Sequence, residues 1–189
     1  MQKKLKAFII TILIVCISYI GIVKLLKIPD RIMKKMYPKT YSEYVTEYSR
    51  EYDVDPLLIY AVIKAESNFK DNVVSNSNAK GVMQLMDSTA DEVASNVMTD
   101  TTFEPNMLFD AGINIKLGTK YLSDLLQKYN GNYCLAIAAY NAGIGTVDKW
   151  IQDGVIKEDG SDIENIPYKE TNNYVRKIIR DYGIYERLY

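Results

Sequence analysis

Apolar positions along the chain fall into one uncharged run and a set of helix-spaced patterns. The run, Ala7–Val23, has 17 residues without a charge and lies between Lys6 and Lys24. This is near the lower limit for a membrane-spanning helix, and lysines at both ends can reach the interface. A cleaved signal peptide is the alternative, but no small-residue cleavage pattern follows closely. We therefore expect a membrane anchor over residues 1–26 and a basic linker over residues 27–40.

Beyond the linker, the pattern predicts a single, mostly α-helical domain over residues 41–189. Apolar and aromatic residues recur three and four positions apart, as on one face of a helix. Polar or glycine-containing segments separate these stretches, and no convincing alternation typical of strands and no repeat appears. The predicted helices cover Tyr41–Tyr52, a buried segment after Pro56, Thr89–Val97 with a cap from Asp87 or Ser88, Asp110–Tyr129, a segment capped by Asn132, and a final helix near Lys169–Tyr182.

Charge and composition exclude several classes of function. Residues 1–39 hold nine Lys or Arg and one acid, whereas the remainder holds 14 bases and 23 acids. An acidic domain is a poor default for nucleic-acid binding, which needs cations against phosphate. The chain has no histidine, which excludes Ser-His and Cys-His catalysis and His-ligated metal sites. We expect no disulfide between the distant Cys16 and Cys134.

One carboxylate stands at the end of the predicted buried helix. Asp55 and Pro56 are typical of a helix start, Leu57–Ile63 is nearly all apolar, and Glu66 follows. The negative end of the helix dipole and burial both disfavour the charged form, so they raise the pKa of Glu66. Such an acid can be protonated at neutral pH, as a general acid must be. By position alone, a solvated or salt-bridged glutamate is the alternative, with Lys64 or Lys70 nearby.

Three further stretches bear on the role of Glu66, and the first, with Gly81 and Gln84, has features of a cleft wall. Ser75–Met86 reads SNSNAKGVMQLM, with a glycine before Val-Met-Gln; Ala136–Gly143 reads AIAAYNAG; Pro167–Val175 reads PYKETNNYV. Each has an ordinary structural interpretation, namely a loop entering a helix, a helix C-cap, and a solvated glutamate beside a core tyrosine. Together with Glu66, and in this order, they resemble the soluble-type lytic transglycosylases, which have a goose-type lysozyme-like α fold. The matching motifs are Glu66-Ser67 with Phe69, Ser75, Gly81–Met86, Ala139–Gly143, Glu170-Thr171 and Tyr174-Val175.

The resemblance implies a role for each matching residue. Glu66 is the single acid and base, and Ser67 secures the turn after it. The remaining residues hold glycan or position Glu66. Two positions depart from the family pattern: Asp87 replaces a usual proline, where it can cap a helix, and Asn172 replaces a common arginine beside Glu170. The implied substrate-binding residues are Ser75, Gln84, Met86, Tyr140, Asn141, Glu170 and Tyr174.

The resemblance also implies a reaction. The substrate is the glycan strand of peptidoglycan, cleaved between N-acetylmuramic acid and N-acetylglucosamine to leave a 1,6-anhydromuramoyl end, without metal or cofactor. Cleavage there requires the domain to lie on the extracytoplasmic side of a single-pass membrane anchor. Two alternatives stay open: a hydrolytic muramidase on the same fold, and a catalytically silent glycan-binding scaffold.

Overall fold

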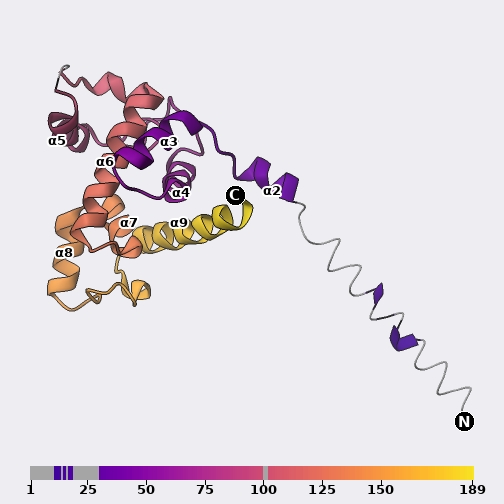
Figure 1. The fold of residues 1–189 in the computed structure, drawn as a ribbon. Helices are drawn as coiled ribbons and strands as arrows, with labels where there is room; N and C mark the ends of the chain where they lie inside the picture. The colour runs from indigo at the N-terminus through magenta and orange to yellow at the C-terminus, as the bar shows by residue number, and fades with distance from the viewer. Residues whose placement is uncertain (1–10, 14, 16, 19–29, 100–101) are drawn as a thin grey trace, which may run out of the picture. The chain divides into compact units, whose positions relative to one another are not determined.

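The computed structural model describes residues 11–13, 15, 17–18, 30–99 and 102–189 (Figure 1). The chain divides into two compact units, Met1–Pro38 with Leu188, and Lys39–Arg187 with Tyr189. In the first unit, helix α2 spans Asp30–Met36, inside the segment predicted as a linker. Within the described part of the chain, no helix combines the length and apolarity needed to cross a membrane. Most of the predicted anchor, Ala7–Val23, lies outside the described residues, so the anchor stays a prediction.

The second unit is helical, as predicted, and α6 is its central element (Figure 1). This helix packs against α3, α5, α7 and the 3-10 helix η1. Extended pairing among the described residues is confined to isolated bridges that join Lys80 to Val74 and to Leu85. The elements are α3 (Ser42–Glu51), α4 (Pro56–Glu66), α5 (Asp87–Val97), η1 (Pro105–Phe109), α6 (Ala111–Lys128), α7 (Tyr133–Ala142), α8 (Ile144–Gln152), η2 (Ile163–Asn165) and α9 (Lys169–Leu188).

Helix α4 is buried on nearly every side. Asp55 caps it by accepting a hydrogen bond of 2.7 Å from the backbone N–H of Leu57, and Pro56 occupies the first turn. Every residue from Leu58 to Ile63 is at most 1% exposed. The Tyr182 hydroxyl of α9 donates to the other Asp55 oxygen at 2.7 Å. The start of α4 is therefore fixed both by its own cap and by α9.

The predicted caps at Asp55 and Asn132 are confirmed, whereas the predicted cap of α5 by Asp87 or Ser88 is wrong. Asp110, predicted as the first residue of its helix, is instead the cap of that helix. Asp110 accepts from the N–H of Ile113 at 2.9 Å, and Asn132 accepts from the N–H of Leu135 at 3.0 Å. Asp87, in contrast, makes no capping bond, because α5 begins at Asp87 itself after an N-cap at Met86.

The Asp87 carboxylate instead pairs with the ammonium group of Lys80. Lys80 is only 9% exposed, and a poorly hydrated ammonium needs an opposite charge nearby. Asp87 therefore serves as the counter-charge of Lys80 instead of as the helix cap that local sequence rules predict.

One helix was not predicted, and another continues further than predicted. Helix α8, which starts directly after Gly143, was not predicted. Helix α9 continues past Tyr182 and Gly183 to Leu188, because Tyr185 is fully buried and its ring stacks on that of Tyr60 with centroids 5.7 Å apart. Tertiary packing thus extends a helix that its glycine would weaken.

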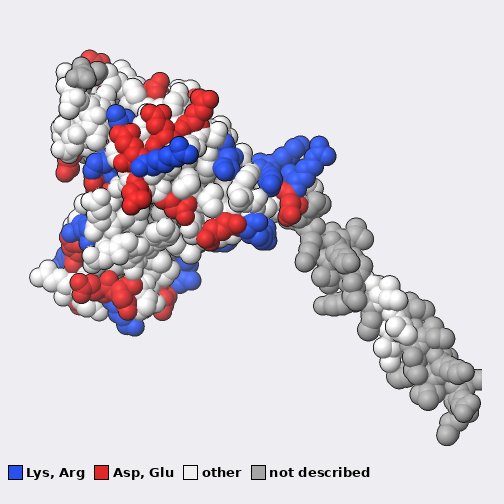
Figure 2. Space-filling model, in the orientation of Figure 1, with Lys and Arg blue, Asp and Glu red and all other residues white. Residues whose placement is uncertain are grey.

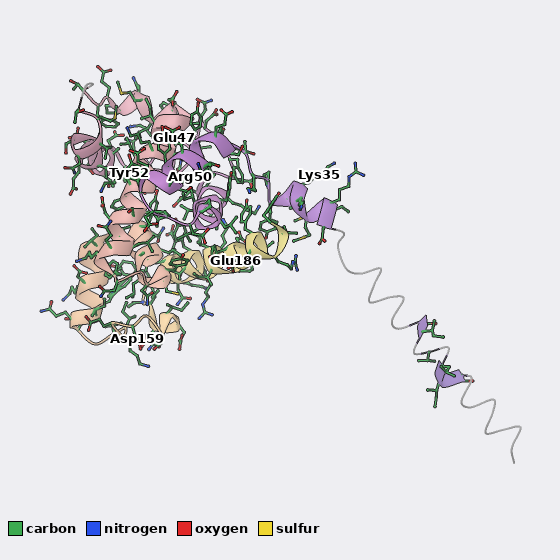
Figure 3. All side chains as sticks on the ribbon, viewed as in Figure 1. Lys35, Glu47, Arg50, Tyr52, Asp159 and Glu186 are labelled. Atoms are coloured by element: carbon green, nitrogen blue, oxygen red, sulfur yellow. The ribbon has the colours of Figure 1, made fainter. Side chains whose placement is uncertain are left out.

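Surface charge differs between the two units. Basic side chains gather on α2, which carries Arg31, Lys34 and Lys35 (Figure 2). On the second unit, the labelled acids Glu47, Asp159 and Glu186 come from α3, the loop after α8, and α9 (Figure 3). These three labelled acids therefore come from three separate elements.

Candidate active site

A cleft of about 590 Å³ lies beside the C-terminal end of α4. Glu66, the last residue of that helix, lines it. Segments from the loop before α5, the end of α7 and the start of α9 complete the wall. Sequences far apart in the chain are therefore brought together around one carboxyl group. Of the seven residues predicted to bind substrate, six line this cleft, namely Ser75, Gln84, Met86, Tyr140, Asn141 and Glu170.

Tyr174, the seventh predicted residue, is not among those that line the cleft. Its hydroxyl donates a hydrogen bond to Oε1 of Glu66. Its position on α9, four residues after Glu170, puts both on one face of that helix. Glu170 reaches the cleft directly, whereas Tyr174 reaches it through Glu66.

The surroundings of Glu66 favour its protonated form. Burial raises the pKa of this carboxyl to about 7, against a smaller opposing effect from the hydrogen bond of Tyr174 and the positive charge of Lys177. The cation whose charge lowers the pKa of Glu66 is Lys177 of α9.

Tyr140 stands beside the same carboxyl from α7. Burial, followed by the charge of Glu66, raises the pKa of the Tyr140 phenol and that of Tyr174 well above the usual value. Both phenols therefore stay protonated and can donate hydrogen bonds. The Tyr140 hydroxyl donates to the backbone carbonyl of Met83 at 2.9 Å, which ties α7 to the loop before α5.

That loop holds its shape through its own side chains. The Ser75 hydroxyl accepts from the N–H of Ala79 at 3.0 Å. Gln84 has a φ of 50°, and its amide nitrogen donates to the carbonyls of Val73 at 3.1 Å and Gly81 at 2.8 Å. Ser75 and Gln84 thus shape the loop as well as line the cleft.

Asn114 is the main positioning residue that sequence reasoning missed. It is fully buried on α6. Its amide nitrogen donates to the carbonyls of Lys80 and Leu108, each at 2.9 Å, and its oxygen accepts from the N–H of Met83 at 2.7 Å. The one available signal was an amide three positions before Leu117, on the buried face of α6, where a side-chain amide is buried only when it is hydrogen-bonded.

Asn141 and Thr171 join α7 to α9 at the cleft wall. The Thr171 hydroxyl donates to the Asn141 side-chain oxygen at 2.8 Å. Asn172, which departs from the family pattern, donates to the carbonyl of Ile163 at 2.7 Å and accepts from Arg176 at 2.7 Å. Its contacts secure η2 and the outer face of α9.

Other cleft features were not predicted. Tyr168 is 56% exposed, and its ring meets that of Trp150 edge-on with centroids 5.0 Å apart. Ser77, Lys169 and Thr171 also line the cleft. Among the described residues, no cluster of three or more Cys, Asp or Glu side chains is placed to hold a metal ion.

Comparison with known proteins identifies the family. Residues 43–162 match the family model described as the transglycosylase SLT domain. The chain belongs to this family. The mostly α, lysozyme-like fold predicted from the sequence agrees with that membership, and the match spans Glu66 together with the loop before α5 and the end of α7 that line the cleft. The individual roles of the cleft residues stay predictions.

Relatives of this SLT-domain chain are longer proteins. The soluble lytic murein transglycosylase of Salmonella typhimurium is 31% identical over 156 residues, which cover 82% of this chain and 24% of the relative. A putative soluble lytic murein transglycosylase of Haemophilus influenzae is 35% identical over 144 residues, covering 75% of this chain and 24% of the relative. The chain thus spans about a quarter of the length of these relatives.

Solved structures share the fold. An inactive glutamate-to-glutamine mutant of the lytic transglycosylase Slt from Pseudomonas aeruginosa matches with a TM-score of 0.74 and 31% identity, over 82% of this chain and 25% of that one. A 70-kDa soluble lytic transglycosylase in complex with bulgecin A matches with a TM-score of 0.75 and 28% identity, over the same shares of the two chains. The SLT domain therefore corresponds to one part of those larger structures.

Proposed function

We propose that this chain is a peptidoglycan lytic transglycosylase. It cleaves the β-1,4 bond between N-acetylmuramic acid and N-acetylglucosamine and leaves a 1,6-anhydromuramoyl end. The observation that carries the proposal is Glu66, a carboxyl with a pKa raised to about 7 on the wall of a cleft, in a domain of the SLT family. The names of the relatives, lytic murein transglycosylases, support the substrate class.

In the first step, Glu66 donates its proton to the glycosidic oxygen as the bond to the muramoyl anomeric carbon breaks. A pKa near 7 keeps a large fraction of the carboxyl protonated at neutral pH, and proton donation is most effective when the pKa is near the working pH. The N-acetylglucosamine leaves with a free hydroxyl.

In the second step, the Glu66 carboxylate takes the proton from the C6 hydroxyl of the same muramoyl residue. The C6 oxygen bonds to the anomeric carbon, and Glu66 returns to its protonated form. Because this nucleophile belongs to the substrate, its effective concentration is high and no enzyme nucleophile is needed. The reaction consumes no water, and Glu66 ends in its starting state.

Binding falls to the other cleft residues. Side-chain amides and hydroxyls suit acetamido and hydroxyl groups of amino sugars, and the exposed Tyr168 ring suits a sugar face. The residues proposed to hold glycan are Ser75, Gln84, Met86, Tyr140, Asn141 and Glu170, with Tyr174 acting on Glu66.

A hydrolytic muramidase is the second candidate, because the cleft contains another carboxylate. Hydrolysis uses a second acid, about 5–5.5 Å away in retaining enzymes or about 6.5–9.5 Å away in inverting ones. Among the described residues that line the cleft, Glu170 is the only other acid. Asp87 pairs with Lys80, and Asp71 does not line the cleft.

Turnover of purified cell wall by Glu170→Gln separates the two candidates. A transglycosylase keeps Glu66 chemistry and loses mainly glycan affinity, so KM rises more than kcat falls. A hydrolase loses its water-activating base, so kcat falls by several orders of magnitude. Glu66→Gln, which lacks the acid, is the inactive control in both cases. A scaffold would show no turnover with the unchanged protein.

The proposed location is the extracytoplasmic side of a cell membrane, with residues 1–26 as a single-pass anchor. The uncharged run Ala7–Val23 between lysines supports this proposal, as does the location of the proposed substrate outside the cytoplasm. Membrane fractionation of the full chain should recover intact protein in the pellet after a high-salt wash. A free form that begins after about residue 25 would instead indicate cleavage.

A further inference from the structure

One cation from α9 lies against the end of α4 that carries Glu66. The Lys177 ammonium donates a hydrogen bond of 2.9 Å to the backbone carbonyl of Ala65, the residue immediately before Glu66. Lys177 follows Tyr174 by three positions on α9, which places both on the same face of that helix. This face therefore presents a hydroxyl to the Glu66 side chain and an ammonium to the backbone beside it.

The end of a helix is an unfavourable place for a carboxylate. Its last carbonyl groups have no partner within the helix, and they form the negative end of the helix dipole. Lysine side chains near a helix C-terminus can satisfy these carbonyls and offset their charge. Lys177 does both for α4, although it comes from a different helix more than 100 positions along the chain.

We propose that Lys177 is a positioning residue for Glu66. Its ammonium fixes the last turn of α4 against α9 and stabilises the carboxylate that Glu66 becomes after it donates its proton. This role rests on the proposed function, since a group that acts first as acid and then as base must be stable in both forms.

The effect on chemistry follows from this balance. Burial alone makes Glu66 a weak acid, because it destabilises the charged product of proton donation. The positive charge of Lys177 acts in the opposite direction and lowers the pKa of Glu66. Without Lys177, Glu66 holds its proton to higher pH and gives it up less readily to the glycosidic oxygen.

The structure places other charged and titratable groups around this pair on α4, α7 and α9. Tyr140 from α7 and Tyr174 from α9 face Glu66, and both stay protonated near neutral pH. Lys64, on α4 itself, interacts electrostatically with Lys177, Arg180 and Asp181. Glu170 lines the same cleft as Glu66.

Direct titration of Glu66 by carboxyl carbon NMR tests the proposal without depending on the product. Lys177→Met should raise the pKa of Glu66 by on the order of 0.5 pH unit or more, and Lys177→Arg should restore it. Lys177→Gln removes the charge but keeps a donor, and it replaces the Met variant if that variant does not fold. Arg176→Met, one position away and bonded to Asn172, removes a charge from α9 and should leave the pKa of Glu66 unchanged.

Kinetics on purified cell wall complete the test. In Lys177→Met, kcat should fall, and the alkaline limb of its pH profile should move to higher pH by the same interval as the titration. A loss of activity with an unchanged Glu66 pKa would overturn the proposal and leave Lys177 a purely structural residue. If the products are hydrolytic but the pKa of Glu66 still shifts in Lys177→Met, the proposed function is overturned and the effect of Lys177 on Glu66 stands.

Discussion

The Tyr174 hydroxyl donates a hydrogen bond to the Glu66 carboxyl, although 108 positions separate the two residues. Eight residues further along α9, the helix that carries Tyr174, the Tyr182 hydroxyl donates to Asp55, the N-cap of α4. Two tyrosines of α9 thus hold both ends of α4. The acid at the C-terminal end of α4 and the cap at its start each accept a hydrogen bond from α9.

Removing the Tyr174 hydroxyl should change the pH dependence of activity. Its hydrogen bond lowers the pKa of Glu66, so Tyr174→Phe should raise that pKa above about 7 and move the alkaline limb of the kcat profile upward. The kcat itself should fall about tenfold or more. Rates on purified peptidoglycan between pH 5 and pH 9 measure both effects.

Tyr182→Phe is the matched control, because it removes a hydroxyl from the same helix at the opposite end of α4. It should lower stability without moving the pH profile. Equal profiles for Tyr174→Phe and the unchanged protein would contradict the assigned link to Glu66.

Glu66→Gln should abolish turnover and stabilise the fold above neutral pH. Folding raises the pKa of Glu66 from 4.5 to about 7, so above pH 4.5 the carboxyl is ionised more readily in the unfolded chain than in the folded one. The free energy of unfolding therefore falls as the pH rises above 4.5, until the pH passes the folded-state value. Glutamine lacks this cost, which is about 2 kcal/mol after allowance for partial solvent access. Thermal unfolding at pH 4 and pH 8 measures the difference.

The two melting temperatures should be similar at pH 4, where the carboxyl is protonated in both states. At pH 8 the Gln variant should melt higher. A lower melting temperature for Glu66→Gln at pH 8 would contradict a carboxyl strained by burial. Retained binding to glycan separates loss of chemistry from loss of structure.

Gly81→Ala should disrupt the loop that carries Gln84. The φ of Gly81 is +76°, and an added Cβ would lie 2.1 Å from the Leu108 carbonyl oxygen and 2.3 Å from the Asn114 amide. Neither neighbour can move easily, because the Asn114 amide donates to that same carbonyl. We expect a loss of about 2 kcal/mol or more in the free energy of unfolding, with reduced activity. Urea unfolding measures the loss in the free energy of unfolding.

Gly145→Ala provides the contrast. This glycine lies within α8, and an added Cβ there would meet nothing within 4 Å. Alanine should leave stability unchanged or increase it by up to about 1 kcal/mol, because it favours the helix. Similar losses in both variants would show that the close contacts of Gly81 have no special weight.

Local sequence features predicted much of this fold. The predicted caps at Asp55 and Asn132 depend on side chains within three residues of the bonds they form. The position of Glu66 at the end of a buried helix follows from the apolar run before it. Such features are readable because the interacting groups are neighbours in the chain.

Contacts between distant segments escaped prediction. Asp87 satisfies the rule for a cap, but the nearly buried Lys80 takes its carboxylate. Asn114 and Lys177 act on backbone groups of other elements, so their own neighbours in sequence give little sign of the role. The loop around Gln84 suggested a cleft by itself, but the set of residues around that cleft was predicted only through resemblance to a family, since its walls come from four parts of the chain.

The chemical nature of the new muramoyl end tests the central claim most directly. Purified peptidoglycan digested by the full chain, and in parallel by Glu66→Gln, should be analysed by mass spectrometry before and after borohydride treatment. The account predicts 1,6-anhydromuramoyl products, lighter than hydrolytic products by one water and unchanged in mass by borohydride, with no product from the Gln variant. Reducible muramic acid ends as the main product, gaining hydrogen on treatment, would contradict it and identify a muramidase.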